Sequence, residues 1–182
     1  MEQNHKRVVG FKLVDKRKIK NQCYYSIYEA IDKNELLAME NILVRKEKEY
    51  FSTLSSEPRK ISYLLGRLSA FEALKEASLM QNVETGITNG IFGQPVLHDK
   101  NFEVSITHTK DVGGCVLYPR DMLLGIDIED INSKHCSAMR SVTTDNEYLD
   151  MKKIISNDKI VLTIIWTLKE AIGKAIKVGF TL

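Results

Sequence analysis

The 182-residue sequence lacks the features that mark several classes of protein. It has three cysteines (Cys23, Cys115 and Cys136) and no CxxC pair, which argues against a disulfide framework or a zinc site. The first residues lack the apolar core of a signal peptide, and no apolar run approaches the roughly 18 residues of a membrane span. The net charge of +2 gives no reason to expect general nucleic-acid binding. These absences predict a cytoplasmic protein that binds neither membranes nor nucleic acids.

Charge is nevertheless uneven along a chain of otherwise ordinary composition. Hydrophobic residues make up 43% and charged residues 27%, as in many globular proteins. Residues 5–20 hold seven Lys or Arg against one Asp. This stretch suits an acidic partner or a phosphate, but a solvated basic face is the more common explanation. Both interpretations stay open.

Residue patterns predict helices early and late in the chain, with strands between them. Helical spacing occurs in residues 33–51, 58–80, 145–156 and 159–178. Residues 7–14 are typical of an opening strand, and the glycine-rich residues 84–96 are predicted to be a loop. From residue 102, polar and apolar residues alternate, which predicts strands. The segments "VGGCVLY" and "MLLGIDIE" flank "PRD", which predicts a hairpin.

The segment "GIDIE" carries two carboxylates, Asp127 and Glu129, in an apolar stretch. Because alternate side chains of a strand share a face, both would lie on one face beside Gly125. The opposite face would consist of Met122, Leu124, Ile126 and Ile128. Neighbouring carboxylates repel each other unless a cation or protons intervene, and Mg²⁺ prefers oxygen ligands. The alternative is a solvated face of an antiparallel sheet.

The helix predicted at 159–178 has an apolar and a charged side. The expected buried stripe consists of Ile165, Leu168, Ile172 and Ile176. Glu170, Lys174 and Lys177 fall on the opposite side of the helix. They suit either a surface Glu–Lys pair or a third metal-binding carboxylate with lysines for phosphate, and spacing alone favours the surface pair.

Together these segments resemble the 4′-phosphopantetheinyl transferases, in particular the longer, broad-specificity type that activates surfactin synthetase. "GIDIE" looks like the metal motif of that family, and "WTLKEAIGK" looks like its second motif. "VSITHT", "FGQP" and "DNEYLDM" are similar to its Ser-His-Ser, Gly-Lys-Pro and Glu-Tyr segments. The resemblance runs in the family's order from about residue 58 to residue 182.

The resemblance implies an α+β fold, a pseudodimer of two similar α/β subdomains with coenzyme A in the cleft between them. We expect an N-terminal subdomain at residues 1–118, a C-terminal subdomain at residues 119–182, and a monomer. The last residues, "KVGFTL", look like a family segment that precedes further β-strands. The second subdomain is therefore expected to be incomplete, either by truncation or by nature.

The implied activity is transfer of 4′-phosphopantetheine from coenzyme A to a serine of an acyl or peptidyl carrier protein. The implied site residues are Asp127, Glu129 and Glu170 for Mg²⁺ (with Mn²⁺ as a substitute), Glu170 and Lys174 for catalysis, and His108, Thr109 and Arg67 for coenzyme A. Three acidic metal ligands with nearby cations suit phosphoryl-type transfer, which depends on positioning and charge neutralisation.

Some residues depart from the family pattern or allow another reading. Gln94 replaces the lysine of the Gly-Lys-Pro turn, and Thr107 and Thr109 replace the two serines around His108. Arg67 can equally be explained by an ion pair with Glu72 or another acid. Two other functions are considered: a catalytically impaired relative that binds coenzyme A or a carrier protein without transfer, and a Mg²⁺-dependent phosphohydrolase.

Overall fold

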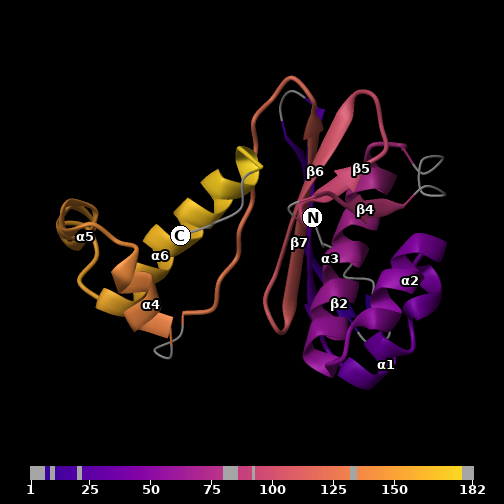
Figure 1. Ribbon diagram of the computed structural model, residues 1–182, viewed down its shortest axis with the longest axis horizontal. Coiled ribbons are helices and arrows are strands. Elements are labelled where there is room, and N and C mark those ends of the chain that lie inside the picture. The colour runs from indigo at the N-terminus through magenta and orange to yellow at the C-terminus, as the bar shows by residue number, and fades with distance from the viewer. Residues whose placement is uncertain are drawn as a thin grey trace.

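A computed structural model describes residues 7–8, 11–19, 22–79, 86–91, 93–131 and 135–177. An antiparallel sheet forms the centre, with helices α1–α3 on one side and helices α4–α6 on the other (Figure 1). The mixed α+β content agrees with the expected fold class. Among the described residues, no helix has the combination of length and apolarity that crossing a membrane requires.

Within the described residues, the sheet has five antiparallel strands. In spatial order they are β1 (Arg7–Val8), β2 (Phe11–Ile19), β3 (Cys23–Ala30), β7 (Val112–Pro119) and β6 (Phe102–His108). The strand predicted from residue 102 is confirmed, and it lies at one edge of the sheet. The strand predicted at residues 7–14 corresponds to β1 and the start of β2, although residues 9–10 lie outside the described residues.

Helix α3 (Glu57–Glu76) covers one face of the sheet and confirms the helix predicted from residue 58. Twelve of its 20 residues are buried. Ala70 and Ala73 pack with Cys115 of β7 in one apolar cluster. Strand and helix approach so closely that a Cβ atom on Gly113 would lie 2.5 Å from the carbonyl carbon of Leu65. This contact requires glycine, because real Cβ atoms do not approach backbone so closely.

The regions on either side of α3 differ from the sequence prediction. Residues 33–53 form α1 (Lys33–Leu37), the 3₁₀ helix η2 (Glu40–Ile42) and α2 (Arg45–Thr53), so the helical spacing is divided among short helices. Residues predicted as a loop contain a hairpin of β4 (Ile87–Asn89) and β5 (Pro95–Leu97). Strands of three residues are too short to show a period of two, so the sequence pattern did not reveal them.

The stretch from Met122 to Glu129 is not the second strand of a hairpin, so that prediction was wrong. Strand β7 already pairs with β3 on one side and β6 on the other, and no free edge is left for a further partner. The stretch instead crosses the sheet face opposite α3, where Met122, Leu124 and Ile126 pack around Val116. The predicted apolar side therefore does face the core, without a backbone ladder.

Between residues 135 and 177, three helices follow this stretch: α4 (Cys136–Ser141), α5 (Asp145–Lys152) and α6 (Asp158–Ala175). The two helices predicted from residues 145 and 159 correspond to α5 and α6, while α4 was not predicted. Residues 120–131 and 135–177 include no strand. The division at residues 118/119 and the pseudodimer stay predictions.

The side of helix α6 that is buried differs from the predicted one. Ile165 is buried, but Leu168, Ile172 and Ile176 are exposed. The side that meets the extended stretch carries Ala171, whose carbonyl oxygen would lie 2.0 Å from a Cβ atom on Gly125. The close approach at this glycine fixes which side of α6 faces inward. The predicted stripe is therefore wrong at three of its four positions.

Candidate functional site

Asp127 lies on the extended stretch, where two hydroxyl groups of β6 hold the backbone in place. The Ile126 N–H donates to Ser105 Oγ (3.2 Å), and the Ile128 N–H donates to Thr107 Oγ1 (3.0 Å). Thr107 Oγ1 in turn donates to Asp127 Oδ1 (3.0 Å), because a hydroxyl can donate and accept at once. The carboxylate of Asp127 is thus oriented by the sheet beneath it.

Lys174 of α6 brings a positive charge to the same carboxylate. Its Nζ donates to Asp127 Oδ1 at 2.6 Å, and the Asp127 side chain is only 5% exposed. The other oxygen, Asp127 Oδ2, is buried and has no hydrogen-bond partner among the described residues. A buried carboxylate oxygen without a partner is costly, so this position favours a further cation or donor.

Two further carboxylates, Glu129 and Glu170, lie within electrostatic reach of Asp127. The indole Nε1–H of Trp166 donates to Glu129 Oε1 at 3.1 Å. Desolvation raises the pKa of both Glu129 and Glu170, and the negative charge of Asp127 raises each pKa further. Lys174 opposes this effect only in part. The three predicted metal ligands therefore repel one another, and Lys174 offsets their negative charge only in part.

These carboxylates fit a divalent cation by their charge and chemistry. Within the described ranges, no three His, Cys, Asp or Glu side chains lie close enough together to form a complete metal site. However, Asp127 Oδ2 lacks a partner, and the pKa values of Glu129 and Glu170 are raised. An oxygen-preferring ion such as Mg²⁺ would relieve both conditions. In the described conformation, Lys174 neutralises Asp127 in part.

A cleft of about 240 Å³ lies beside these groups. The turn between β4 and β5, the edge strand β6 and helix α6 all contribute to its walls. Residues that line it include Gln94, Ser105, Tyr118, Glu170, Lys174 and Lys177. The cleft therefore combines both predicted catalytic residues with the turn in which glutamine replaces lysine.

His108 and Thr109 lie at the end of β6. Residues with even numbers in β6 face α3, and the His108 ring lies beside Gly66 of that helix, whereas Thr107 faces Asp127. Desolvation lowers the pKa of His108 although the residue keeps exposed surface, and the charge of Lys174 lowers it further. Thr109 Oγ1 accepts from the N–H groups of Asp111 and Val112, so it also shapes the β6–β7 turn. Coenzyme A contacts by either residue stay predictions.

Arg67 lies away from the cleft, on α3. Its Nε is 3.2 Å from Glu47 Oε1, and its Nη2 donates to the carbonyl of Ile87 (3.0 Å). Glu72, considered as a partner from the sequence, is instead bound by Lys16. The ion pair of Arg67 is thus present with a different acid. Its predicted contact with coenzyme A remains untested.

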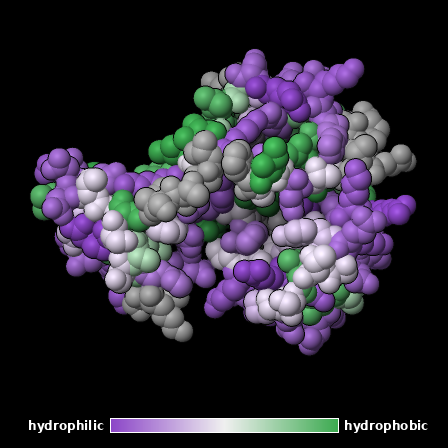
Figure 2. All heavy atoms as spheres, viewed as in Figure 1, coloured by the Kyte–Doolittle hydropathy of each residue, from purple (hydrophilic) through white to green (hydrophobic). Residues whose placement is uncertain are grey.

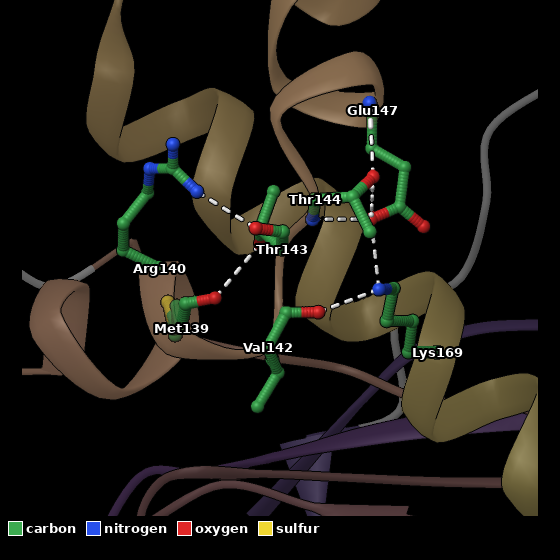
Figure 3. A network of polar contacts seen from close by, with 7 residues as sticks. All are labelled: Met139, Arg140, Val142, Thr143, Thr144, Glu147 and Lys169. Carbon is green, nitrogen blue, oxygen red and sulfur yellow. Dashed lines mark hydrogen bonds and ion pairs between the residues drawn. The ribbon is translucent and has the colours of Figure 1, made fainter.

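Lys169, directly before Glu170, connects α6 to the start of α5 (Figure 3). Its Nζ donates to the carbonyl of Val142 (2.6 Å) and to Glu147 Oε2 (2.8 Å). The same Glu147 oxygen accepts from the N–H of Thr144 (2.8 Å). The bond from Lys169 is the main reason why the pKa of Glu147 falls to about 2. This network fixes the rotation of α6 at the turn that presents Glu170.

Sequence reasoning missed the roles of three contributors to this arrangement, Ser105, Thr107 and Lys169. Ser105 was noted only as a polar member of an alternating strand, Thr107 also as the replacement for a serine beside His108, and Lys169 only as a letter of a motif. The alternation did show that both hydroxyls share a face, but the sequence held no sign of which segment covers that face. The partner of Lys169 was equally hidden, because Glu147 is 22 residues away.

Comparisons with known proteins identify relatives of this chain. A family model described as the 4′-phosphopantetheinyl transferase superfamily matches residues 123–182. The chain is similar to the holo-[acyl-carrier-protein] synthase of Staphylococcus haemolyticus, with 33% identity over 92 residues, 46% of this chain and 77% of the relative. It is also similar to the protein of the same name from Bacillus velezensis, with 38% identity over 104 residues, 44% of this chain and 84% of the relative.

Proposed function

Because this chain belongs to the 4′-phosphopantetheinyl transferase superfamily, we propose that it converts an apo carrier protein to its holo form. It transfers 4′-phosphopantetheine from coenzyme A to a serine hydroxyl of an acyl carrier protein. The observation that carries this proposal is the cleft beside Asp127, in which Glu170 and Lys174 line one wall. The names of the two relatives support an acyl carrier protein as the acceptor.

Mg²⁺, or Mn²⁺ in its place, would be held by Asp127, Glu129 and Glu170. The unpartnered Asp127 Oδ2 and the raised pKa values of Glu129 and Glu170 support this assignment. When bound, the ion would neutralise charge on the pyrophosphate of coenzyme A. Thr107 contributes by holding the Asp127 carboxylate in a fixed orientation.

Glu170 is proposed as the base that accepts the proton of the acceptor serine, directly or through one water. Its carboxylate lines the cleft beside Asp127, and a carboxylate positioned next to the acceptor hydroxyl can take up its proton. As the proton leaves, the serine oxygen forms a bond to the phosphorus that carries pantetheine. The bond from that phosphorus to the bridging oxygen breaks, and 3′,5′-adenosine bisphosphate leaves. Lys174 balances negative charge on the reacting phosphates.

The remaining assignments are proposals that follow from the resemblance. His108 and Thr109, at the rim of the sheet, and Arg67, behind it, are assigned to coenzyme A. Of the three, His108 has the best support, because the charges of Lys174 and Asp127 both act on its pKa. Arg67 has the weakest support, because its guanidinium is buried against Glu47.

We also propose the longer, broad-specificity type, built as a pseudodimer. The aligned region is less than half of this chain but more than three quarters of each relative, so this chain is longer than either relative. A peptidyl carrier protein is then a second acceptor to test. A cytoplasmic location and a monomeric state are further proposals.

Intact-mass spectrometry of an apo acyl carrier protein tests the proposal. Incubation with this chain, coenzyme A and Mg²⁺ should add the mass of one phosphopantetheine group, and EDTA should prevent the addition. Asp127→Asn and Glu170→Gln should each reduce the rate by about two to four orders of magnitude, the range expected for loss of an acid–base or charge-stabilising group. Circular dichroism should show that both variants remain folded.

Three outcomes would count against parts of this proposal. Coenzyme A binding without any mass gain would indicate the catalytically impaired relative. Breakdown of coenzyme A without a carrier protein would indicate the phosphohydrolase. Full activity of Asp127→Asn or Glu170→Gln would contradict the residue assignments and leave the family membership intact.

A further inference from the structure

The cleft contains a second lysine, Lys177, that the reaction described above does not use. It follows the last residue of α6 and its C-cap, Ile176, and its backbone φ is 59°. This left-handed conformation is uncommon for a residue other than glycine. Lys177 lines the 240 Å³ cleft and also the smaller hollow of about 90 Å³ beside it, and Gln94 lines both as well.

Lys177 is paired with Glu103, an acid that lines the smaller hollow. Its Nζ lies 2.6 Å from Glu103 Oε2, and the side chains are 45% and 17% exposed, respectively. The other oxygen, Glu103 Oε1, lies 4.0 Å from an Nη1 atom of Arg120. Burial raises the pKa of Tyr118 to about 12, and the charge of Glu103 contributes to this rise. Glu103 would therefore keep neighbours of its own if Lys177 moved to another partner.

We propose that Lys177 binds a phosphate of coenzyme A and that Glu103 is the counter-ion which this phosphate displaces. The inference rests on the proposed function, because it takes coenzyme A as the occupant of the cleft. Of the residues described as lining the cleft, Lys174 and Lys177 are the cationic ones. Lys174 is held against the buried Asp127. Lys177 is half exposed, and Arg120 lies near the other oxygen of Glu103, so Glu103 keeps a cation nearby when Lys177 exchanges it for phosphate.

The position of Gln94 explains why Lys177 matters in this chain. Gln94 brings a neutral amide to the cleft, at the position where the resembling family has lysine. Because Gln94 and Lys177 line the same two hollows, a lysine at either position would bring positive charge to one region. Lys177 thus supplies, from the end of α6, the charge that the β4–β5 turn lacks.

Calorimetric titration of the full chain with coenzyme A measures this contact without relying on turnover. Lys177→Asn removes the charge but tolerates the left-handed backbone, so the variant should fold. We expect its Kd to rise about ten-fold, as for loss of one charge-assisted hydrogen bond, while Lys177→Arg stays near wild type. Glu103→Gln should tighten binding, because phosphate no longer competes with the carboxylate.

A second variant and a control make the test specific. Gln94→Lys added to Lys177→Asn should recover most of the lost affinity. Lys153→Gln removes an exposed, ion-paired lysine at the C-cap of α5 and should leave the Kd unchanged. Repeating the titration with dephospho-coenzyme A identifies the phosphate. If Lys177→Asn no longer raises the Kd for this ligand, Lys177 contacts the 3′-phosphate. If the rise in Kd persists, Lys177 contacts the pyrophosphate.

The outcomes separate this inference from the proposed function. If wild type modifies carrier protein and Lys177→Asn binds coenzyme A as tightly as wild type, Lys177 is not a phosphate ligand. Looser binding by Glu103→Gln would likewise contradict a displaced counter-ion. If wild type neither binds coenzyme A nor modifies carrier protein, the proposed function itself fails.

Discussion

Helices α3 and α6 have similar lengths, 20 and 18 residues, but they are used in different ways. Helix α3 buries twelve residues between the sheet and the helices that precede it, whereas α6 buries five. The apolar Leu168 and Ile172 of α6 remain exposed, and its Glu170 and Lys174 line the cleft. Figure 2 shows hydrophobic surface in green along the upper side of α6. Packing around α3 supports stability, while α6 carries the proposed site residues Glu170 and Lys174 at an accessible surface.

Each helix approaches its neighbour at one glycine, which makes the two regions comparable. At Gly113, an added Cβ would meet the backbone of Leu65 in α3 at 2.5 Å. At Gly125, it would meet the carbonyl oxygen of Ala171 in α6 at 2.0 Å. An added methyl group is therefore blocked at both positions. At Gly113 it would displace α3, which packs in the core, and at Gly125 it would displace α6, which carries the candidate site residues.

Gly113→Ala and Gly125→Ala should differ most in how they divide their effects between stability and transfer rate. Gly125→Ala should lower the transfer rate about 100-fold, because an ångström of misplacement at a reacting group costs that much. Its thermal midpoint should fall less than that of Gly113→Ala. Gly113→Ala should reduce the free energy of unfolding by about 1–3 kcal/mol, as overpacking of a core does. Carrier-protein mass spectrometry and thermal unfolding measure the two effects.

Equal losses of stability and of activity in both variants would contradict the different roles proposed for α3 and α6. If Gly125→Ala lost as much stability as Gly113→Ala, α6 would belong to the same cooperative unit as the sheet. If it kept full activity, the position of α6 on the extended stretch would not control Glu170.

The extended stretch shows what the sequence could and could not predict about the fold. Alternation placed Leu124 and Ile126 on a core-facing side, and the structure confirms it. The predicted ladder with β7 was wrong, because strand pairing depends on β3 and β6, which lie far away in the sequence. The prediction of which α6 residues are buried was wrong for the same reason, because burial also depends on contacts between distant segments. The periodicity identified an apolar stripe, but the contact at Gly125 determines which side faces inward.

The network at Lys169 offers a smaller perturbation of α6 alone. Lys169→Met should lower kcat about ten-fold and leave the KM for coenzyme A nearly unchanged, because Lys169 orients Glu170 without lining the cleft. Lys169→Arg should restore much of the rate, since arginine can also donate to Glu147. A rise in KM without a change in kcat would instead place Lys169 in substrate binding.

The same network predicts a dependence of stability on pH. The pKa of Glu147 is lowered from 4.5 to about 2, so its carboxylate stabilises the fold fully above 4.5. This contribution is lost as the pH falls through the interval down to about 2. The thermal midpoints of wild type and Glu147→Gln should therefore differ near neutral pH and converge on acidification. A gap of constant size would show that Lys169 and Glu147 do not pair in solution.

Candidate site residues were easier to name from the sequence than the residues that orient them. Asp127 and Glu129 stood out because two carboxylates in an apolar segment are unusual, whereas Glu170 was assigned through the resemblance. Thr107 and Lys169 did not stand out, since hydroxyl and ammonium groups are common on any surface. Their importance arises from partners, Asp127 and Glu147, that only the fold brings near. Local sequence could thus suggest candidate residues, while their orientation required tertiary structure.

The smallest effect on stability should come from truncating a leucine on the exposed side of α6. The same truncation in α3 serves as the comparison. Leu65→Ala truncates a side chain that is 0% exposed and should cost about 2–5 kcal/mol. Leu168→Ala makes the same change at a side chain that is 55% exposed and should alter stability by no more than about 0.5 kcal/mol. Transfer should also be unchanged, because Leu168 does not line the cleft. A large loss on Leu168→Ala, measured by denaturant unfolding, would mean that the apolar side of α6 is covered in solution.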